Sequence, residues 1–187
     1  MRQARRSLDP HQREVHAQAL ALRLRRHPLL LRSKRIGFYI PVQGEMNPWP
    51  LIDALVKLRK DVFLPVLLPF NCNRLWFAPY TPEVEMAPNR FGIPEPDVHP
   101  CSMLRPIALD VVLTPLVAFD ANANRLGMGG GYYDRTFAFL RRRGCWNRPH
   151  LIGLAYEFQR TSKLTPSPWD VPLAMVATES SLYIRKG

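Results

Sequence analysis

Apolar runs bounded by turn-forming residues recur along the whole chain and alternate with stretches of helical periodicity. The runs predict buried strands over 35–40, 61–66, 75–80, 110–119, 150–156, 175–178 and 182–184. Strands separated by helical segments are typical of a parallel sheet with helices packed on both faces. We therefore expect an α/β fold: a single domain over 1–187 with a three-layer, mostly parallel, Rossmann-like sheet flanked by helices.

Three helices are predicted, one before the first strand and two between strands. The first covers about 10–26, with Asp9 as its N-cap and a proline at its first position. The second covers 47–58, where leucine and isoleucine recur at helical spacing, and the third covers 132–143. The proline-rich stretch 81–106 is expected to cross the surface as loop and short turns.

Glycine fills four of the five positions from 127 to 131, between the predicted strand 110–119 and the predicted helix at 132. Bare backbone that enters a helix presents several N–H donors at the positive end of the helix dipole, which suits a phosphate group. The spacing is neither a Walker A loop nor a dinucleotide fingerprint, because no Lys-Ser/Thr follows and Tyr132 takes the place of the third glycine. A hairpin turn with positive φ angles is the alternative, although the run of three glycines favours a phosphate loop.

Charged residues near this loop are candidates for magnesium and phosphate chemistry. Asp134 would lie in the first helical turn, where it could hold Mg²⁺ beside a phosphate or could only stabilise the helix N-terminus. Asp170 is a candidate second carboxylate, and Arg125 could clamp phosphate oxygens or be an ordinary surface arginine. Glu45 follows the first strand and should lie at the same sheet edge, where it could accept N–H donors of a heterocycle.

The net charge of +11 is unevenly distributed over the 187 residues. Residues 1–36 hold ten Lys and Arg against two acids, which gives +8 and leaves +3 for the rest of the chain. This basic segment could attract nucleic acid, a polyphosphate or a polycarboxylate, or could simply form a solvated helix face.

No apolar stretch reaches the roughly 18 residues of a membrane helix, and the three scattered cysteines favour neither a disulfide framework nor a zinc site. We expect a cytoplasmic protein without a membrane partner.

The motif Arg125-Leu-Gly-Met-Gly-Gly-Gly-Tyr-Tyr-Asp-Arg135 resembles that of the 5-formyltetrahydrofolate cyclo-ligase family. The resemblance includes the flanking segments 114–120, 170–173 and 178–179, and it extends over essentially the whole chain. It implies ATP- and Mg²⁺-dependent conversion of 5-formyltetrahydrofolate to 5,10-methenyltetrahydrofolate, with release of ADP and phosphate. Small-molecule substrates would then be the partners, with no nucleic acid, and we expect a monomer or a weak homodimer.

The resemblance also implies roles for individual residues. The ATP-binding residues would be Arg125, Leu126, Gly127, Met128, Gly129, Gly130, Gly131, Tyr132 and Tyr133. The folate-binding residues would be Ile40, Glu45, Phe91, Gly129, Gly130, Gly131 and Tyr132. Arg125 and Tyr132 would be catalytic, and Asp134 and Asp170 would be the magnesium carboxylates.

The chain departs from the family pattern in two places. The family usually has a Lys-x-x-Leu-Arg-type motif near its start that touches ATP, and Arg2, Arg5 and Arg6 are the nearest counterparts here. No role is carried over to these three arginines. The family also often has an acid where this chain has Ala174, which leaves Asp170 as the nearer metal candidate.

The chemistry of this reaction agrees with the absence of a recognisable nucleophile motif in the sequence. The N5-formyl oxygen would attack the γ-phosphate in line, N10 would then add to the activated carbon, and phosphate would leave. Positioning and charge neutralisation would carry the catalysis. A basic nucleic-acid-binding domain and a sugar-phosphate-binding α/β protein are the alternative functions.

Overall fold

A seven-stranded sheet lies at the centre of the protein in the computed structural model, which describes residues 1–68, 74–141 and 148–185. The strand order is β11-β10-β9-β6-β1-β2-β3. In sequence order the strands are β1 (Arg35–Gly37), β2 (Asp61–Leu67), β3 (Leu75–Tyr80), β6 (Val111–Pro115), β9 (His150–Leu154), β10 (Met175–Ala177) and β11 (Leu182–Ile184). The five inner strands run parallel, whereas β3 and β11 pair antiparallel at the two edges. The predicted mostly parallel α/β fold is confirmed.

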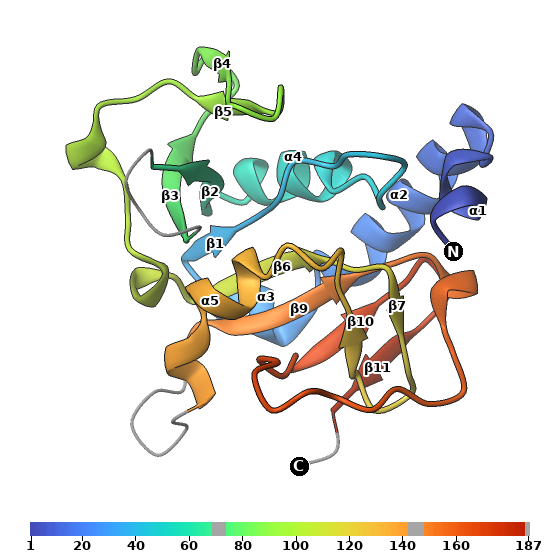
Figure 1. The fold of residues 1–187 in the computed structure, drawn as a ribbon. Coiled ribbons are helices and arrows are strands. Elements are labelled where there is room, and N and C mark those ends of the chain that lie inside the picture. The colour runs from blue at the N-terminus through green and yellow to red at the C-terminus, as the bar shows by residue number, and fades with distance from the viewer. Residues whose placement is uncertain (69–73, 142–147, 186–187) are drawn as a thin grey trace.

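The helices pack around this sheet, and the N-terminal helices lie on the side of α4 (Figure 1). The helices are α1 (Arg2–Arg6), α2 (Pro10–Leu24), α3 (Pro28–Arg32), α4 (Trp49–Lys57) and α5 (Tyr132–Thr136). Short 3₁₀ turns are η1 (Pro100–Ser102), η2 (Pro106–Ala108), η3 (Ala138–Arg141) and η4 (Glu157–Gln159). The predicted cap of α2 is confirmed, because the Asp9 carboxylate accepts hydrogen bonds from the backbone N–H groups of His11 and Gln12.

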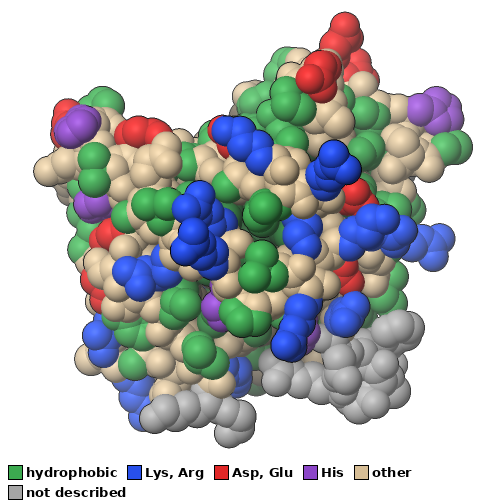
Figure 2. Space-filling model, turned by 180° about the vertical axis from the view of Figure 1, so that it is seen from behind, with side chains coloured by type: hydrophobic (Ala, Val, Ile, Leu, Met, Phe, Trp, Pro, Cys, Tyr) green, Lys and Arg blue, Asp and Glu red, His purple; other side chains and the backbone are tan. Residues whose placement is uncertain are grey.

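Several arginines of the basic N-terminal segment are used inside the fold. Arg13 donates to the carbonyl of Arg6 (2.7 Å), and Arg23 donates to the carbonyl of Glu179 (3.3 Å). Arg5 is fully buried. Figure 2 shows the back of the molecule, where Lys and Arg side chains are spread among hydrophobic and uncharged ones.

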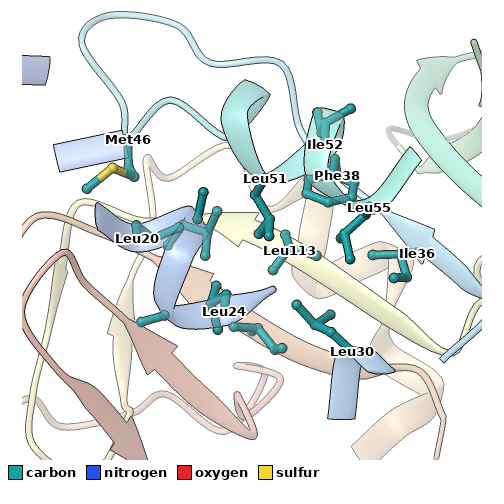
Figure 3. Close-up of a cluster of buried hydrophobic side chains, with 14 of the residues drawn as sticks. Leu20, Leu24, Leu30, Ile36, Phe38, Met46, Leu51, Ile52, Leu55 and Leu113 are labelled. Atoms are coloured by element: carbon teal, nitrogen blue, oxygen red, sulfur yellow. The ribbon is translucent and has the colours of Figure 1, made fainter. Parts of the chain in front are cut away.

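Two hydrophobic cores cover the two faces of the sheet. Alternation along β6 sends Val111 and Leu113 into the first core and Val112 into the second. In the first core, side chains of α2, α3 and α4 pack on the sheet (Figure 3). The second core contains Phe137 and Leu140, which follow the glycine loop. The loop is therefore connected to a packed layer and not to a free surface segment.

Several of the predicted elements differ from the structure: the strands expected over 35–40 and 150–156, for example, end at Gly37 and Leu154. The predicted strand 110–119 was wrong as a single strand: β6 ends at Pro115, and Ala118–Phe119 forms β7, which pairs with β8 (Arg125–Leu126) in a separate hairpin. The chain leaves the central sheet between β6 and β7. At this point the carbonyls of Leu116 and Val117 accept hydrogen bonds from the side-chain amide of Gln159.

The predicted helix 132–143 is shorter in the structure, because α5 has five residues and continues as the 3₁₀ turn η3 to Arg141. Residues 142 and 143 lie outside the described residues. The stretch 81–106, expected as loop, contains a small antiparallel hairpin of β4 (Met86–Pro88) and β5 (Pro94–Pro96).

Within residues 1–68, 74–141 and 148–185, no helix is both long and apolar enough to span a membrane. Cys101 is an exposed thiol, and Cys72 and Cys145 lie outside the described residues. The compartment, the oligomeric state and the extent of a single domain over 1–187 stay predictions.

Candidate active site at the glycine loop

The glycine loop joins the β7-β8 hairpin to α5. Residues Asp120 to Asn124 form the turn of this hairpin. The backbone N–H and the side-chain amide of Asn124 both donate to the Asp120 carboxylate. The glycines therefore do not form the hairpin turn. Gly129 and Gly131 have positive φ angles of 88° and 63°, and Gly131 is the N-cap of α5. The glycines therefore provide bare backbone between a hairpin and a helix start, which is the arrangement that the phosphate-loop interpretation requires.

A cavity of about 760 Å³ lies against this loop. All nine residues predicted to bind ATP, 125–133, line this cavity. Both carboxylates predicted to bind magnesium, Asp134 and Asp170, line it as well. Ile40, Glu45 and Phe91 are not among the lining residues. The structure thus brings the predicted ATP and magnesium residues together around one cavity and leaves the three folate-specific residues outside it.

Arg125 and Asp134 form an ion pair on the wall of this cavity. The guanidinium donates to the Asp134 carboxylate (Nη2 to Oδ1, 2.5 Å) and to the carbonyl of Val171 (2.7 Å), and the Arg125 side chain is only 6% exposed. The Val171 N–H also donates to Asp134 Oδ1 (3.1 Å). Arg125 therefore positions Asp134 and the segment around 171, and its predicted direct contact with phosphate stays a prediction.

Asp134 and Asp170 have the chemistry that a magnesium ion with phosphate ligands requires. Both contacts of Asp134 use Oδ1, and Asp170 accepts the N–H of Ser167 on its Oδ2 (2.7 Å), so each carboxylate keeps a second oxygen that can face the cavity. In the part of the chain that the structure describes, no group of three or more His, Cys, Asp or Glu could hold a metal. Two carboxylates fit a site completed by phosphate and water oxygens, which is how Mg²⁺ is commonly bound.

Tyr132, which lines the cavity, contacts Phe91 beside the glycine loop. Phe91 lies at the tip of the β4-β5 hairpin, is 57% exposed and packs edge-on against Tyr132 with ring centroids 6.3 Å apart. Arg90 donates to the Tyr132 hydroxyl (3.1 Å) and lies 5.0 Å from the centre of the Phe91 ring. A distant hairpin thus provides an exposed aromatic surface beside the loop, which suits a flat heterocyclic substrate.

Glu45 is a buried carboxylate beside the second tyrosine of the motif. It is 6% exposed and accepts the backbone N–H of Val42 (3.1 Å). Burial raises the pKa of Glu45, while the Val42 hydrogen bond and the charge of Arg5 oppose that rise. Burial also raises the pKa of Tyr133, and the charge of Glu45 adds to this effect. The predicted neighbourhood of Glu45 and the glycine-loop motif is therefore present, whereas Ile40 is half-buried against the first core.

The short helix α1 reaches the glycine loop, which the sequence reasoning did not foresee. Arg5 is 1% exposed and donates to the carbonyl of Leu116 (3.0 Å), and its other terminal nitrogen lies 4.0 Å from the Met128 sulfur. Arg2 donates to the Met128 carbonyl (3.3 Å). The spacing of two arginines three residues apart was the available signal, since such residues share one helix face.

Gly44 has no side chain, and this allows the backbone of α1 to lie close to the turn that contains Gly44. Its φ is +73°, and a Cβ at this position would be 2.7 Å from the carbonyl oxygen of Arg5. We expect Gly44→Ala to destabilise the fold by about 1–3 kcal/mol, which should lower Tm by about 2–10 °C in a thermal melt. Gly92→Ala is the matched control, because Gly92 has a φ of +71° with nothing within 4 Å of the added carbon. Equal losses in the two variants would contradict the contact between Gly44 and α1.

A mostly parallel sheet with a glycine loop beside a cavity defines the class of this protein as an α/β protein, and such a loop suits a phosphorylated ligand. Comparison with known proteins narrows this class. The model of the 5-formyltetrahydrofolate cyclo-ligase family matches residues 1–179. The chain belongs to this family, and the resemblance found from the sequence is confirmed.

Individual relatives agree with this assignment. The 5-formyltetrahydrofolate cyclo-ligase of Escherichia coli (strain K12) is 38% identical over 183 residues, which are 98% of each chain. The cyclo-ligase of Haemophilus influenzae is 41% identical over 169 residues, covering 89% of this chain and 86% of the relative. The NMR structure of 5,10-methenyltetrahydrofolate synthetase from Aquifex aeolicus superposes with a TM-score of 0.82 and 28% identity, covering 100% of this chain and 90% of that chain.

Proposed function

We propose that this protein is a 5-formyltetrahydrofolate cyclo-ligase that uses ATP and Mg²⁺ to form 5,10-methenyltetrahydrofolate. The observation that carries the proposal is the single cavity that contains the complete glycine motif 125–133 together with Asp134 and Asp170. Membership of the cyclo-ligase family provides the reaction. The predicted site residues thus have a physical arrangement that suits the chemistry.

The two substrates would occupy opposite sides of the glycine loop. The triphosphate lies in the cavity, against the loop N–H groups and near the cations Arg74, Arg135 and Arg141. The folate lies on the other side, where Glu45 accepts N–H groups of the pterin and Phe91 with Tyr132 contacts its ring system. Gly129 to Gly131 would then lie between the two substrates, so the same residues could touch both.

Magnesium would be held by Asp134 and Asp170, and its charge would neutralise that of the phosphate oxygens. The protein residues prepare this site. Arg125 holds Asp134 in place, and the hydrogen bond from Val171 to Asp134 fixes the segment that carries Asp170.

The chemistry follows from the poor reactivity of a formamide. Its oxygen is a weak nucleophile, and oxide cannot leave, so transfer of the γ-phosphoryl group to that oxygen creates a leaving group. N10 then attacks the activated formyl carbon, and inorganic phosphate departs with the former formyl oxygen. The loop holds the γ-phosphate in line with the formyl oxygen, and positioning of this kind can replace a covalent enzyme intermediate.

The test is an absorbance assay for methenyl-folate formation, run with and without ATP and Mg²⁺, combined with a measurement of released phosphate. We expect product only when both are present, with one phosphate released for each methenyl group formed. Product formation without ATP, or phosphate release without product, would contradict the proposal. The nucleic-acid alternative gains no support from Arg5, Arg13 and Arg23, because these arginines bind protein carbonyls.

A further inference from the structure

Trp169 is the most exposed large hydrophobic residue among those that the structure describes, at 64% of its surface. It lies in the segment 164–170, which lines the same 760 Å³ cavity as the glycine loop. Single exposed apolar side chains are common on protein surfaces, so the position of Trp169 in the cavity lining, and not its exposure alone, points to a ligand. Across residues 1–68, 74–141 and 148–185, neither an aromatic ring nor a cation is found stacked on the Trp169 ring.

The backbone around Trp169 is fixed at several points although its ring is exposed. The N–H of Leu164 donates to the Asp120 carboxylate (3.0 Å), and Ser167 and Asp170 exchange two hydrogen bonds across the turn that carries Trp169. The following residue, Val171, donates to Asp134. A hydrogen-bonded turn therefore presents an exposed indole ring on the lining of the cavity.

The lining of the cavity includes both polar and apolar groups. The glycine N–H groups with Arg74, Arg135 and Arg141 suit the phosphates, whereas Leu164 and Trp169 provide apolar surface. A nucleoside triphosphate has the same division between a charged chain and a flat ring. We propose that Trp169 stacks on the base of the bound nucleotide and so determines the affinity for ATP; this inference rests on the proposed function.

Kinetics of three proteins test the inference. We expect Trp169→Leu to raise the KM for ATP about tenfold, with the KM for 5-formyltetrahydrofolate and kcat nearly unchanged, and Trp169→Phe to retain most of the affinity because it keeps a ring. Inorganic tripolyphosphate, which has no base, should inhibit the wild type and Trp169→Leu equally well. An unchanged KM for ATP in Trp169→Leu, or a rise in the folate KM instead, would overturn the inference.

Fluorescence separates this result from a failure of the proposed function. Binding of ATP should change the intrinsic tryptophan fluorescence of the wild type and of the control Trp76→Phe, whose indole lies under Arg105 and outside the cavity lining. Trp169→Phe should lose this change. The titration needs no turnover, so a wild type without cyclo-ligase activity would disprove the proposed reaction, whereas an unaltered signal in Trp169→Phe would disprove base stacking.

Discussion

Asp134→Asn is expected to lower the rate of methenyl-folate formation by about 10²–10³-fold at saturating ATP. Asparagine has nearly the same shape, and its oxygen can still accept the N–H of Val171. It lacks the negative charge that would hold Mg²⁺ beside the phosphates and that pairs with Arg125. The loss should therefore appear in kcat and in the concentration of Mg²⁺ required, measured in the absorbance assay.

Asp134→Asn will also destabilise the fold, because the Arg125 side chain is 6% exposed and loses its counter-charge. Asp110→Asn is the matched control. Asp110 pairs with Arg148 (3.0 Å) and accepts backbone N–H groups of Lys34 and Arg35, but it precedes β6, at the other end of the strands. The control should lose stability while it keeps its turnover. A rate for Asp134→Asn within about threefold of the control, assayed below both melting temperatures, would remove the metal role.

Glu45→Gln should raise the KM for 5-formyltetrahydrofolate by about 10–100-fold, since hydrogen bonds to a charged group contribute about 1.5–3 kcal/mol. The amide oxygen can still accept the N–H of Val42, so the turn is preserved. The KM for ATP should change much less. Glu157→Gln is the control, because Glu157 is a carboxylate bound to Thr178 and Tyr183 within the protein. An unaltered folate KM in Glu45→Gln would refute the assignment.

Ionisation of Glu45 should also make folate binding and the stability of the fold depend on pH. Because burial raises the pKa of Glu45, its carboxylate becomes protonated at a higher pH than an ordinary glutamate, and folate binding should weaken as the pH falls through that raised pKa. Ionisation of Glu45 also costs stability as the pH rises from the unfolded pKa to the raised folded one, because the folded state holds the proton more tightly. Glu45→Gln should lose both dependences.

Local patterns determine much of this fold and are visible in the sequence. The Asp9 cap, the alternation along β6 and the glycine run each act over a few residues, so period and composition predict them. The single strand expected over 110–119 failed because long-range partners decided it. The side-chain amide of Gln159 donates hydrogen bonds to the carbonyls of Leu116 and Val117. No local pattern in the sequence identifies a donor that lies some forty residues away.

The site shows the same division. The glycine loop and Asp134 follow from one motif, whereas Asp170 lies outside that motif and reaches the cavity through the fold. The Arg125–Asp134 pair, the burial of Arg5 and the approach of Phe91 to Tyr132 depend on tertiary packing, and the sequence offers only the residue types. The roles of individual residues in binding ATP, folate and magnesium accordingly stay predictions until variants are measured.

The fate of the formyl oxygen tests the central claim most directly. 5-Formyltetrahydrofolate labelled with ¹⁸O in its formyl group should be converted in the presence of ATP and Mg²⁺, and the released inorganic phosphate should be analysed by mass spectrometry. Transfer of the γ-phosphoryl group to that oxygen predicts one ¹⁸O in each phosphate released. Unlabelled phosphate, with the ¹⁸O found in water, would contradict the account.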